Sequence, residues 1–234
     1  MSAASDKYEL DTAKYMNTVV RMLDKKGFAK RPKVGTDFAD VQMKFRNVET
    51  WCEVKMSHTD NLSNPRVFYI NGKWDTTYTT PAAKYAVDIL NKSNDTKKFL
   101  KDIAKYSGIP LKQLRIPTTK SGLREPGAVP LKVMFAYFSQ PGMTRYIADE
   151  KNYNLGKVVT EHYTIGKTKP AYYMQAGDDF YMISNKNPFK FKGVPALSGR
   201  GDFRVRIATR SDYYEVQAEI KIKEMPRSKY SMSV

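Results

Sequence analysis

The sequence predicts an α/β (α+β) protein in which helices flank a mixed central β-sheet. Apolar and polar residues alternate through residues 40–45 and 51–56, which is the period of a strand with one buried face. Residues 5–26, 82–91 and 94–106 instead place apolar residues at helical spacing, after residue types that favour helix starts. Strand and helix patterns therefore occur in one chain of 234 residues.

The first helix is expected from a cap at Ser5 or Asp6 to about Lys26. Its apolar stripe consists of four residues at helical spacing, Ala13, Met16, Val20 and Leu23. One step back along this stripe stands Glu9. Burying an unpaired carboxylate is costly, so Glu9 either reaches solvent at the helix end or points into a polar site.

Two strands with a tight turn between them follow the helix. Their apolar positions share one face of the sheet: Val41, Met43 and Phe45 on the first strand, and Cys52, Val54 and Met56 on the second. A four-residue loop from Arg46 to Glu49 would pair Phe45 with Thr50. This register sets Gln42 opposite Glu53, and Asp40 opposite Lys55.

In that register Asp40 and Glu53 are diagonal neighbours on the polar face of the hairpin. Diagonal side chains lie roughly 7 Å apart, a gap that a divalent cation with oxygen ligands can bridge. Lys55 adds a positive charge that could hold an attacking water or a phosphate. The two acids and the lysine are thus explained by a single kind of site.

This arrangement of an Asp, a strand turn and Glu-x-Lys resembles the PD-(D/E)XK nuclease superfamily. The resemblance implies a restriction-endonuclease-like core, Mg²⁺ (or Mn²⁺) as cofactor, Asp40 and Glu53 as metal ligands, and Lys55 as the catalytic lysine. It also implies a further ligand in the backbone carbonyl of Val54 and a helper carboxylate in Glu9.

The position before the motif acid departs from the superfamily pattern, because Ala39 stands where a proline is usual. Asp37 is a rival for the role of Asp40. We prefer Asp40 because it opens the strand on the face of Glu53. A nearby histidine, His58, follows the second strand, but a surface histidine is the simpler interpretation, and His162 has no assignable role.

The overall charge favours a nucleic-acid partner. Forty Lys and Arg residues against 24 Asp and Glu give a formal charge of +16, which supplies sequence-independent attraction to phosphate backbones. DNA is the expected partner, and RNA is a further alternative. No apolar run is long enough to span a membrane, and the lone cysteine, Cys52, fits a reducing compartment, so a cytoplasmic protein is expected.

The middle of the chain is expected to extend and cover the sheet. Residues 66–70 read as a strand, Asn71-Gly72 as a hairpin turn, and Thr80-Pro81 as the start of the helix before a second one capped by Ser93 or Asn94. The apolar run 131–138 is expected to be a buried strand that closes the central sheet.

The last third is strand-rich and basic, so a nuclease core over residues 1–145 and a DNA-contacting subdomain over 146–234 are expected, unless both form one continuous domain. Residues 203–207 and 216–222 read as a hairpin. Five basic residues are the candidate DNA-binding set: Arg204, Arg206, Arg200, Lys190 and Lys192. Alternatively, Glu215 and Glu219 on the second strand simply pair with the arginines of the first.

These observations predict a Mg²⁺-dependent endonuclease of the phage or restriction type that acts on DNA. A homodimer, which could cut both strands, is a further expectation. The alternative is a basic nucleic-acid-binding or structural protein without catalytic activity, in which Glu53 and Lys55 form a surface ion pair.

Overall fold

The protein is described by a computed structural model that covers residues 3–32, 39–57, 61–154, 156–165, 167, 169–222 and 225–232. The chain forms two compact units. Unit 1 comprises residues 1–60, 154–200 and 222–234, and unit 2 comprises residues 61–153 and 201–221. The chain thus passes repeatedly between the units, whereas the sequence predicted one boundary after residue 145 or a single continuous domain.

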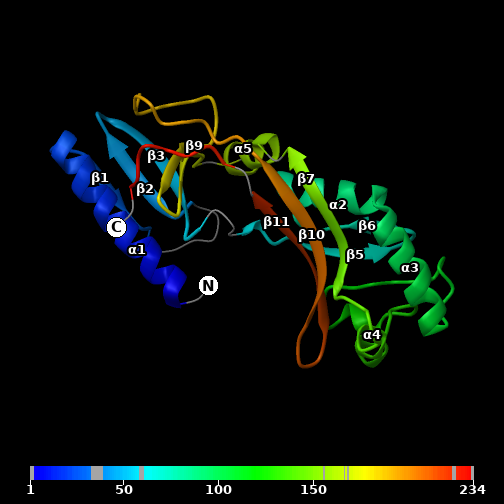
Figure 1. Cartoon of the computed structure of the whole chain (residues 1–234). Helices are drawn as coiled ribbons and strands as arrows, with labels where there is room; N and C mark the ends of the chain where they lie inside the picture. The colour runs from blue at the N-terminus through cyan, green and yellow to red at the C-terminus, as the bar shows by residue number, and fades with distance from the viewer. Residues whose placement is uncertain are drawn as a thin grey trace. The chain divides into compact units, whose positions relative to one another are not determined.

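Unit 1 contains a mixed sheet between helices. Its elements are α1 (Ala3–Leu23), β1 (Phe28–Lys30), β2 (Val41–Phe45), β3 (Val48–Lys55), α5 (Gly156–Thr164), β8 (Ala171–Ala176) and β9 (Asp179–Met182). The strand order is β1-β2-β3-β8-β9, in which β3 and β8 run parallel and the other neighbours antiparallel. Figure 1 shows α1 alongside β1 and β2. The predicted fold class is confirmed.

The turn between β2 and β3 differs from the predicted four-residue loop. Only Arg46 and Asn47 form it, both with positive φ (48° and 66°), which is the backbone of a two-residue hairpin turn. Phe45 consequently pairs with Val48, and Val41 with Cys52. The predicted register was wrong because asparagine at a positive φ permits a shorter loop than the residue pattern suggested.

The apolar stripe of α1 packs on one face of this sheet. Ala13, Met16 and Val20 are buried in a core with Val41, Met43, Phe45, Cys52 and Val54. Leu23, predicted to continue the stripe, is 62% exposed because the helix ends at this residue, and Met56, just after β3, is also exposed. The predicted caps, Ser5 and Asp6, lie inside the helix, which already includes Ala3.

The core of unit 1 is completed by a segment close to the end of the chain. Met232 is buried in the same hydrophobic cluster as the side chains of α1 and β2. Its N–H donates to Oε1 of the buried Gln175 on β8 at 2.8 Å, and the N–H of Phe180 on β9 donates to the carbonyl of Tyr230 at 2.9 Å. Three separate stretches of chain therefore build one core.

Unit 2 contains the second sheet, covered by helices. Its elements are β4 (Asn61–Ser63), β5 (Arg66–Ile70), β6 (Lys73–Asp75), α2 (Pro81–Lys92), α3 (Asn94–Ser107), the 3₁₀ turn η1 (Gly122–Arg124), α4 (Leu131–Phe138), β7 (Tyr146–Asn154), β10 (Arg200–Thr209) and β11 (Tyr214–Ile222). The strand order is β6-β5-β11-β10-β7, and β4 pairs with β11. The strands β5 and β6 therefore belong to this sheet and do not extend that of unit 1.

Local signals in unit 2 are mostly confirmed. Asn71 and Gly72 form the turn between β5 and β6, both at positive φ. The Thr80 hydroxyl accepts from the N–H of Ala83 at the start of α2, and α3 ends at Gly108 in the left-handed conformation. These positions show why short-range chemistry is readable from sequence.

Residues 131–138 form the helix α4 and not the predicted closing strand. Pro130 precedes the first turn as the N-cap residue, where a missing N–H is harmless. Met134 and Tyr137, three positions apart, are its buried residues, which is helical spacing. A short apolar run fits both a buried strand and a helix, so its period alone could not decide.

Candidate active site

The hairpin of β2 and β3 brings Asp40, Glu53 and Lys55 together on one face of the unit 1 sheet. Val41 pairs with Cys52, so the residue before β2, Asp40, comes directly opposite Glu53 and not diagonal to it as predicted. The N–H of Val54 donates to Oδ2 of Asp40 at 2.8 Å. Lys55, two residues from Glu53, places its Nζ 2.6 Å from Oε1 of that carboxylate.

The two carboxylates of this cluster are withdrawn from water. Glu53 is only 8% exposed. Burial raises the pKa of Asp40 to about 8, and the charge of Glu53 acts in the same direction. The Val54 hydrogen bond and the Lys55 charge oppose that rise without cancelling it. One lysine thus does not fully compensate the buried Glu53 and the half-buried Asp40.

Lys55 keeps its positive charge in this setting. Burial by itself would lower the pKa of Lys55, but the adjacent Glu53 carboxylate raises it, and the net effect is a pKa above the ordinary value. A lysine with a raised pKa is a charge and a hydrogen-bond donor, and not a base. Its chemistry at this site is therefore electrostatic.

Helix α5 adds two residues to the site that the sequence analysis missed or left without a role. The hydroxyl of the buried Tyr163 donates to Oε1 of Glu53 at 3.2 Å, and burial together with Glu53 raises the pKa of Tyr163 above its ordinary value. Burial lowers the pKa of His162 to about 4, with Lys167 and Lys55 acting in the same direction. Nδ1 of His162 is buried without a hydrogen-bond partner in the described part of the chain.

Glu9 is buried on α1 and points into a polar cluster, which was one of its two predicted alternatives. Nη2 of Arg31 lies 2.8 Å from Oε2 of Glu9 and 2.6 Å from Oδ1 of Asp6. Ser5 donates to Oε1 of Glu9 at 3.3 Å. Glu9 contributes to raising the pKa of Asp40, so its charge is felt at the cluster. Arg31 is a partner that the helix pattern could not reveal.

The carboxylate oxygens of Asp40 and Glu53 are suitable ligands for a divalent cation because their negative charges are only partly balanced. Within the described residues no group of three or more His, Cys, Asp or Glu is arranged to hold a metal ion. Asp40 and Glu53 each use one oxygen for protein donors, and in the same described ranges the second oxygen of each has no protein donor. Carboxylate oxygens are ligands of Mg²⁺, which commonly keeps waters in its remaining positions.

A bound cation would also remove the repulsion between the negative charges of Asp40 and Glu53, which Lys55 balances only in part. The Val54 carbonyl belongs to the strand between Glu53 and Lys55 and would be a third oxygen donor. Asp37 and His58, the other residues considered for this site, lie outside the described residues. Cys52 is buried on the opposite, apolar face of β3 and is a free thiol.

The five basic residues predicted to bind DNA do not belong to one unit. Lys190, Lys192 and Arg200 are exposed residues of unit 1, whereas Arg204 and Arg206 lie on β10 in unit 2. The two strand arginines have acidic partners.

Nε of Arg206 lies 2.9 Å from Oε1 of Glu219, and Nε of Arg204 lies 3.5 Å from Oδ1 of Asp149. The alternative that an acid of the second strand pairs with a strand arginine is thus realised for Arg206. Glu215 instead pairs with Arg66 and Arg210.

The chain was compared with known families, curated proteins and solved structures. No known protein family and no curated protein matches the chain. Among solved structures it is similar to HhaI endonuclease in complex with DNA, with 16% sequence identity over 98% of this chain and 94% of that chain, at a TM-score of 0.27. No helix in the described part of the chain is long and apolar enough to cross a membrane.

Proposed function

We propose that the protein is a metal-dependent endodeoxyribonuclease of the PD-(D/E)XK type, with Mg²⁺ (or Mn²⁺) held by Asp40, Glu53 and the Val54 carbonyl. The observation that carries the proposal is a buried carboxylate, Glu53, directly opposite the half-buried Asp40, with one charged lysine beside them. Burial of like charges is unfavourable for stability, and strongly perturbed carboxylates with a specific charge partner are typical of functional sites.

The residues of the site take distinct roles in this proposal. Mg²⁺, when bound, supplies a Lewis acid for the scissile phosphate and lowers the pKa of a water. Asp40 must give up its proton to become a ligand. Lys55 remains protonated and donates to the attacking water or to the phosphate oxygens, whose charge increases during displacement. Tyr163 orients Glu53 through its hydrogen bond. Glu9, which is paired with Arg31, adds a negative charge near Asp40.

DNA is the substrate that the composition favours. A formal charge of +16 gives attraction to a polyanion regardless of its sequence, and a steep dependence of binding on salt. A homodimer with two such sites would cut both strands of a duplex.

The test is cleavage of supercoiled plasmid by the full-length protein in Mg²⁺, in Mn²⁺ and in EDTA. Lys55→Ala is compared with Lys44→Ala, which removes a lysine from the neighbouring strand of the same hairpin. Conversion to nicked or linear plasmid that requires the metal and Lys55, but not Lys44, supports the proposal. Cleavage that persists in EDTA, or that both variants lose equally, contradicts it.

A second candidate is a nucleic-acid-binding protein without catalysis. The Glu53–Lys55 ion pair at 2.6 Å favours it, since such a pair is satisfied without a metal. The same assay separates the two functions, because a binder retards intact plasmid on a gel equally in Mg²⁺ and EDTA.

A further inference from the structure

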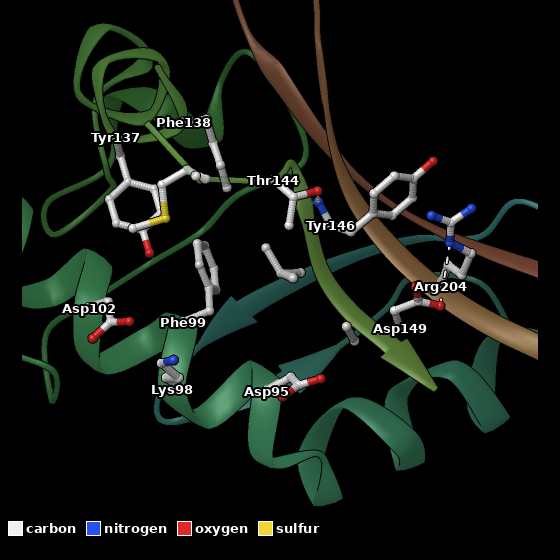
Figure 2. Close-up of a pocket in the computed structure, with 14 residues that line it drawn as sticks. Asp95, Lys98, Phe99, Asp102, Tyr137, Phe138, Thr144, Tyr146, Asp149 and Arg204 are labelled. Atoms are coloured by element: carbon white, nitrogen blue, oxygen red, sulfur yellow. Dashed lines mark hydrogen bonds and ion pairs between the residues drawn. The ribbon is translucent and has the colours of Figure 1, made fainter. Parts of the chain in front are cut away.

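Unit 2 contains a cavity of about 400 Å³ that the proposed nuclease site does not use. It lies between α3, α4, the start of β7 and β10, and all of its lining residues belong to unit 2. In Figure 2 the side chains of Phe99, Tyr137 and Phe138 lie to one side of β7, and those of Tyr146 and Arg204 lie to the other, near β10. A nucleobase is a flat group that a cavity of this size can enclose.

The walls of the cavity are aromatic. The rings of Phe99 on α3 and Phe138 on α4 are nearly parallel, at an interplanar angle of 15° and 6.0 Å between centroids. Tyr137 meets both of these rings nearly edge-on. Tyr146 at the start of β7 lines the other side. Flat apolar walls of this kind accept a flat ring by stacking.

The lining of the cavity also includes three carboxylates and two cations. Asp95, Asp102 and Asp149 supply hydrogen-bond acceptors, and Lys98 and Arg204 supply donors. The acidic excess disfavours a phosphate group inside. It suits a neutral heterocycle whose amino groups donate to a carboxylate and whose ring acceptors meet a lysine or an arginine.

An organic cation is a poorer occupant, because the protein already supplies one. The Arg204 guanidinium lies 3.8 Å from the centroid of the Tyr146 ring and 3.5 Å from Asp149, as the dashed line in Figure 2 marks. A ligand cation would have to displace this guanidinium from both the ring and the carboxylate. The pair Arg204–Asp149 instead presents a donor beside an acceptor.

Lys98 lines the cavity from α3, and two further lysines follow it along this helix. Lys98, Lys101 and Lys105 are exposed and share one side of the helix at spacings of three and four residues. None of them forms an ion pair in the residues that the structure describes. The row of these three lysines spans about 10 Å along the helix. A phosphate backbone can therefore follow the row while a base enters beside it.

We infer that unit 2 binds an unstacked nucleotide of a DNA strand, with its base in the cavity of Phe99, Phe138 and Tyr146 and its flanking phosphates on Lys98, Lys101 and Lys105. This inference rests on the proposed function for the choice of DNA. It gives Arg204 the task of recognising a base edge, in place of tracking phosphates on an exposed strand face.

Binding is tested in EDTA, where the proposed cleavage does not proceed, by fluorescence anisotropy of a labelled single-stranded 12-mer with the full-length protein. Phe138→Ala should weaken binding about 5- to 150-fold, the range for losing one base stack. A 12-mer with abasic positions should bind the wild type as weakly as the normal 12-mer binds this variant. Asp149→Asn, an exposed change that the fold tolerates, should alter the preference among homopolymers of the four bases.

The lysine row gives a different signature. Replacing Lys98, Lys101 and Lys105 by alanine should lower the slope of log K against log salt by about 2 for a single strand. The matched control replaces Lys14, Lys25 and Lys26, exposed lysines of unit 1, and removes the same charge. An equal change of slope in both triple variants overturns the phosphate assignment.

Base-independent binding by the wild type, with Phe138→Ala and Asp149→Asn unchanged, overturns the pocket even if plasmid is cleaved. Base-dependent binding in a protein that cleaves nothing supports the pocket and refutes the nuclease. Competition by a free nucleoside monophosphate would identify a free nucleotide as a further occupant of the same pocket, and its absence would restrict the pocket to a DNA strand.

Discussion

Each unit buries carboxylates, but the two units treat them in opposite ways. In unit 2, Glu215 is 0% exposed and has Arg66 at 3.1 Å, Arg210 at 3.2 Å and the Tyr213 hydroxyl at 3.0 Å. Burial alone would raise the pKa of Glu215, but Tyr213 and the two arginines lower it below the ordinary value. In unit 1, burial and Glu53 raise the pKa of Asp40 to about 8.

Glu215 is therefore an acid that stabilises the fold, whereas Asp40 and Glu53 lack enough positive charge nearby to balance them. Glu215 has four partners, Arg66, Arg210, Tyr213 and Gln217, and is satisfied within the protein. Asp40 and Glu53 share a single nearby lysine, and their repulsion is relieved by a proton or a cation. Carboxylates kept in such a state are the usual mark of catalysis or metal binding.

The largest expected effect is on activity. Asp40→Asn and Glu53→Gln should each lower plasmid cleavage about 10²- to 10³-fold or more, the size of effect seen when one electrostatic contact to a transition state is lost. Rates of nicking in Mg²⁺ measure it. Glu49→Gln, an exposed change on the same hairpin, is the control and should keep wild-type activity. Full activity in Asp40→Asn would refute the assigned ligand set.

The next effect is on stability and has opposite signs in the two units. Glu215→Gln should cost about 1–3 kcal/mol of unfolding free energy, because arginines arranged around a buried carboxylate lose their charged acceptor. Asp40→Asn in EDTA at pH 8 should stabilise the protein, since it removes an unfavourable charge. Urea unfolding measures both. Destabilisation of equal size in the two variants would remove the distinction drawn between the units.

The dependence of stability on pH should isolate Asp40. Its pKa is 3.8 in the ordinary state and about 8 in the fold, so the folded protein holds the extra proton between these values. Stability from this group is therefore complete below about pH 4 and declines as the pH rises through 8, with a slope of at most about 1.4 kcal/mol per pH unit.

Urea midpoints between pH 5 and 8 in EDTA should thus fall more steeply for the wild type than for Asp40→Asn. Mg²⁺ should restore wild-type stability at pH 8, because a cation takes the place of the proton. Parallel pH profiles of the two proteins would show that Asp40 titrates normally.

The smallest effect is expected from Tyr163→Phe. The loss of one hydrogen bond to Glu53 should cost about 1 kcal/mol and lower cleavage about tenfold or less. Tyr181→Phe is the matched control, since Tyr181 is also buried and donates to the carbonyl of Pro226 at 2.7 Å. Both variants should lose stability, but only Tyr163→Phe should lose activity. Equal activity in the two variants would assign Tyr163 to the fold alone.

Local chemistry was the part of the molecule that the sequence could predict. The faces of β2 and β3 follow from alternation, and the Thr80 cap of α2 and the Asn71-Gly72 turn follow from residue type. The three site residues lie within 16 positions of one another in the sequence, so one hairpin was enough to bring them together.

Long-range packing was the part that could not be predicted. Tyr163 contacts Glu53 from 110 positions away, and Arg31 reaches Glu9 from another element. Neither contact leaves a periodic trace in the sequence. The helix at residues 131–138 was misread because an apolar run has no period, and burial in tertiary contacts decided its conformation.

The assembly of unit 1 from three stretches has a consequence for the order of synthesis. The strands that carry Asp40, Glu53 and Lys55 leave the ribosome early, yet the core beneath them includes Met232, and Gln175 needs the backbone of that residue as its donor. While most of unit 2 is being translated, the acidic hairpin has only part of its support. The core of unit 1 can therefore be completed only after residue 232 has been synthesised.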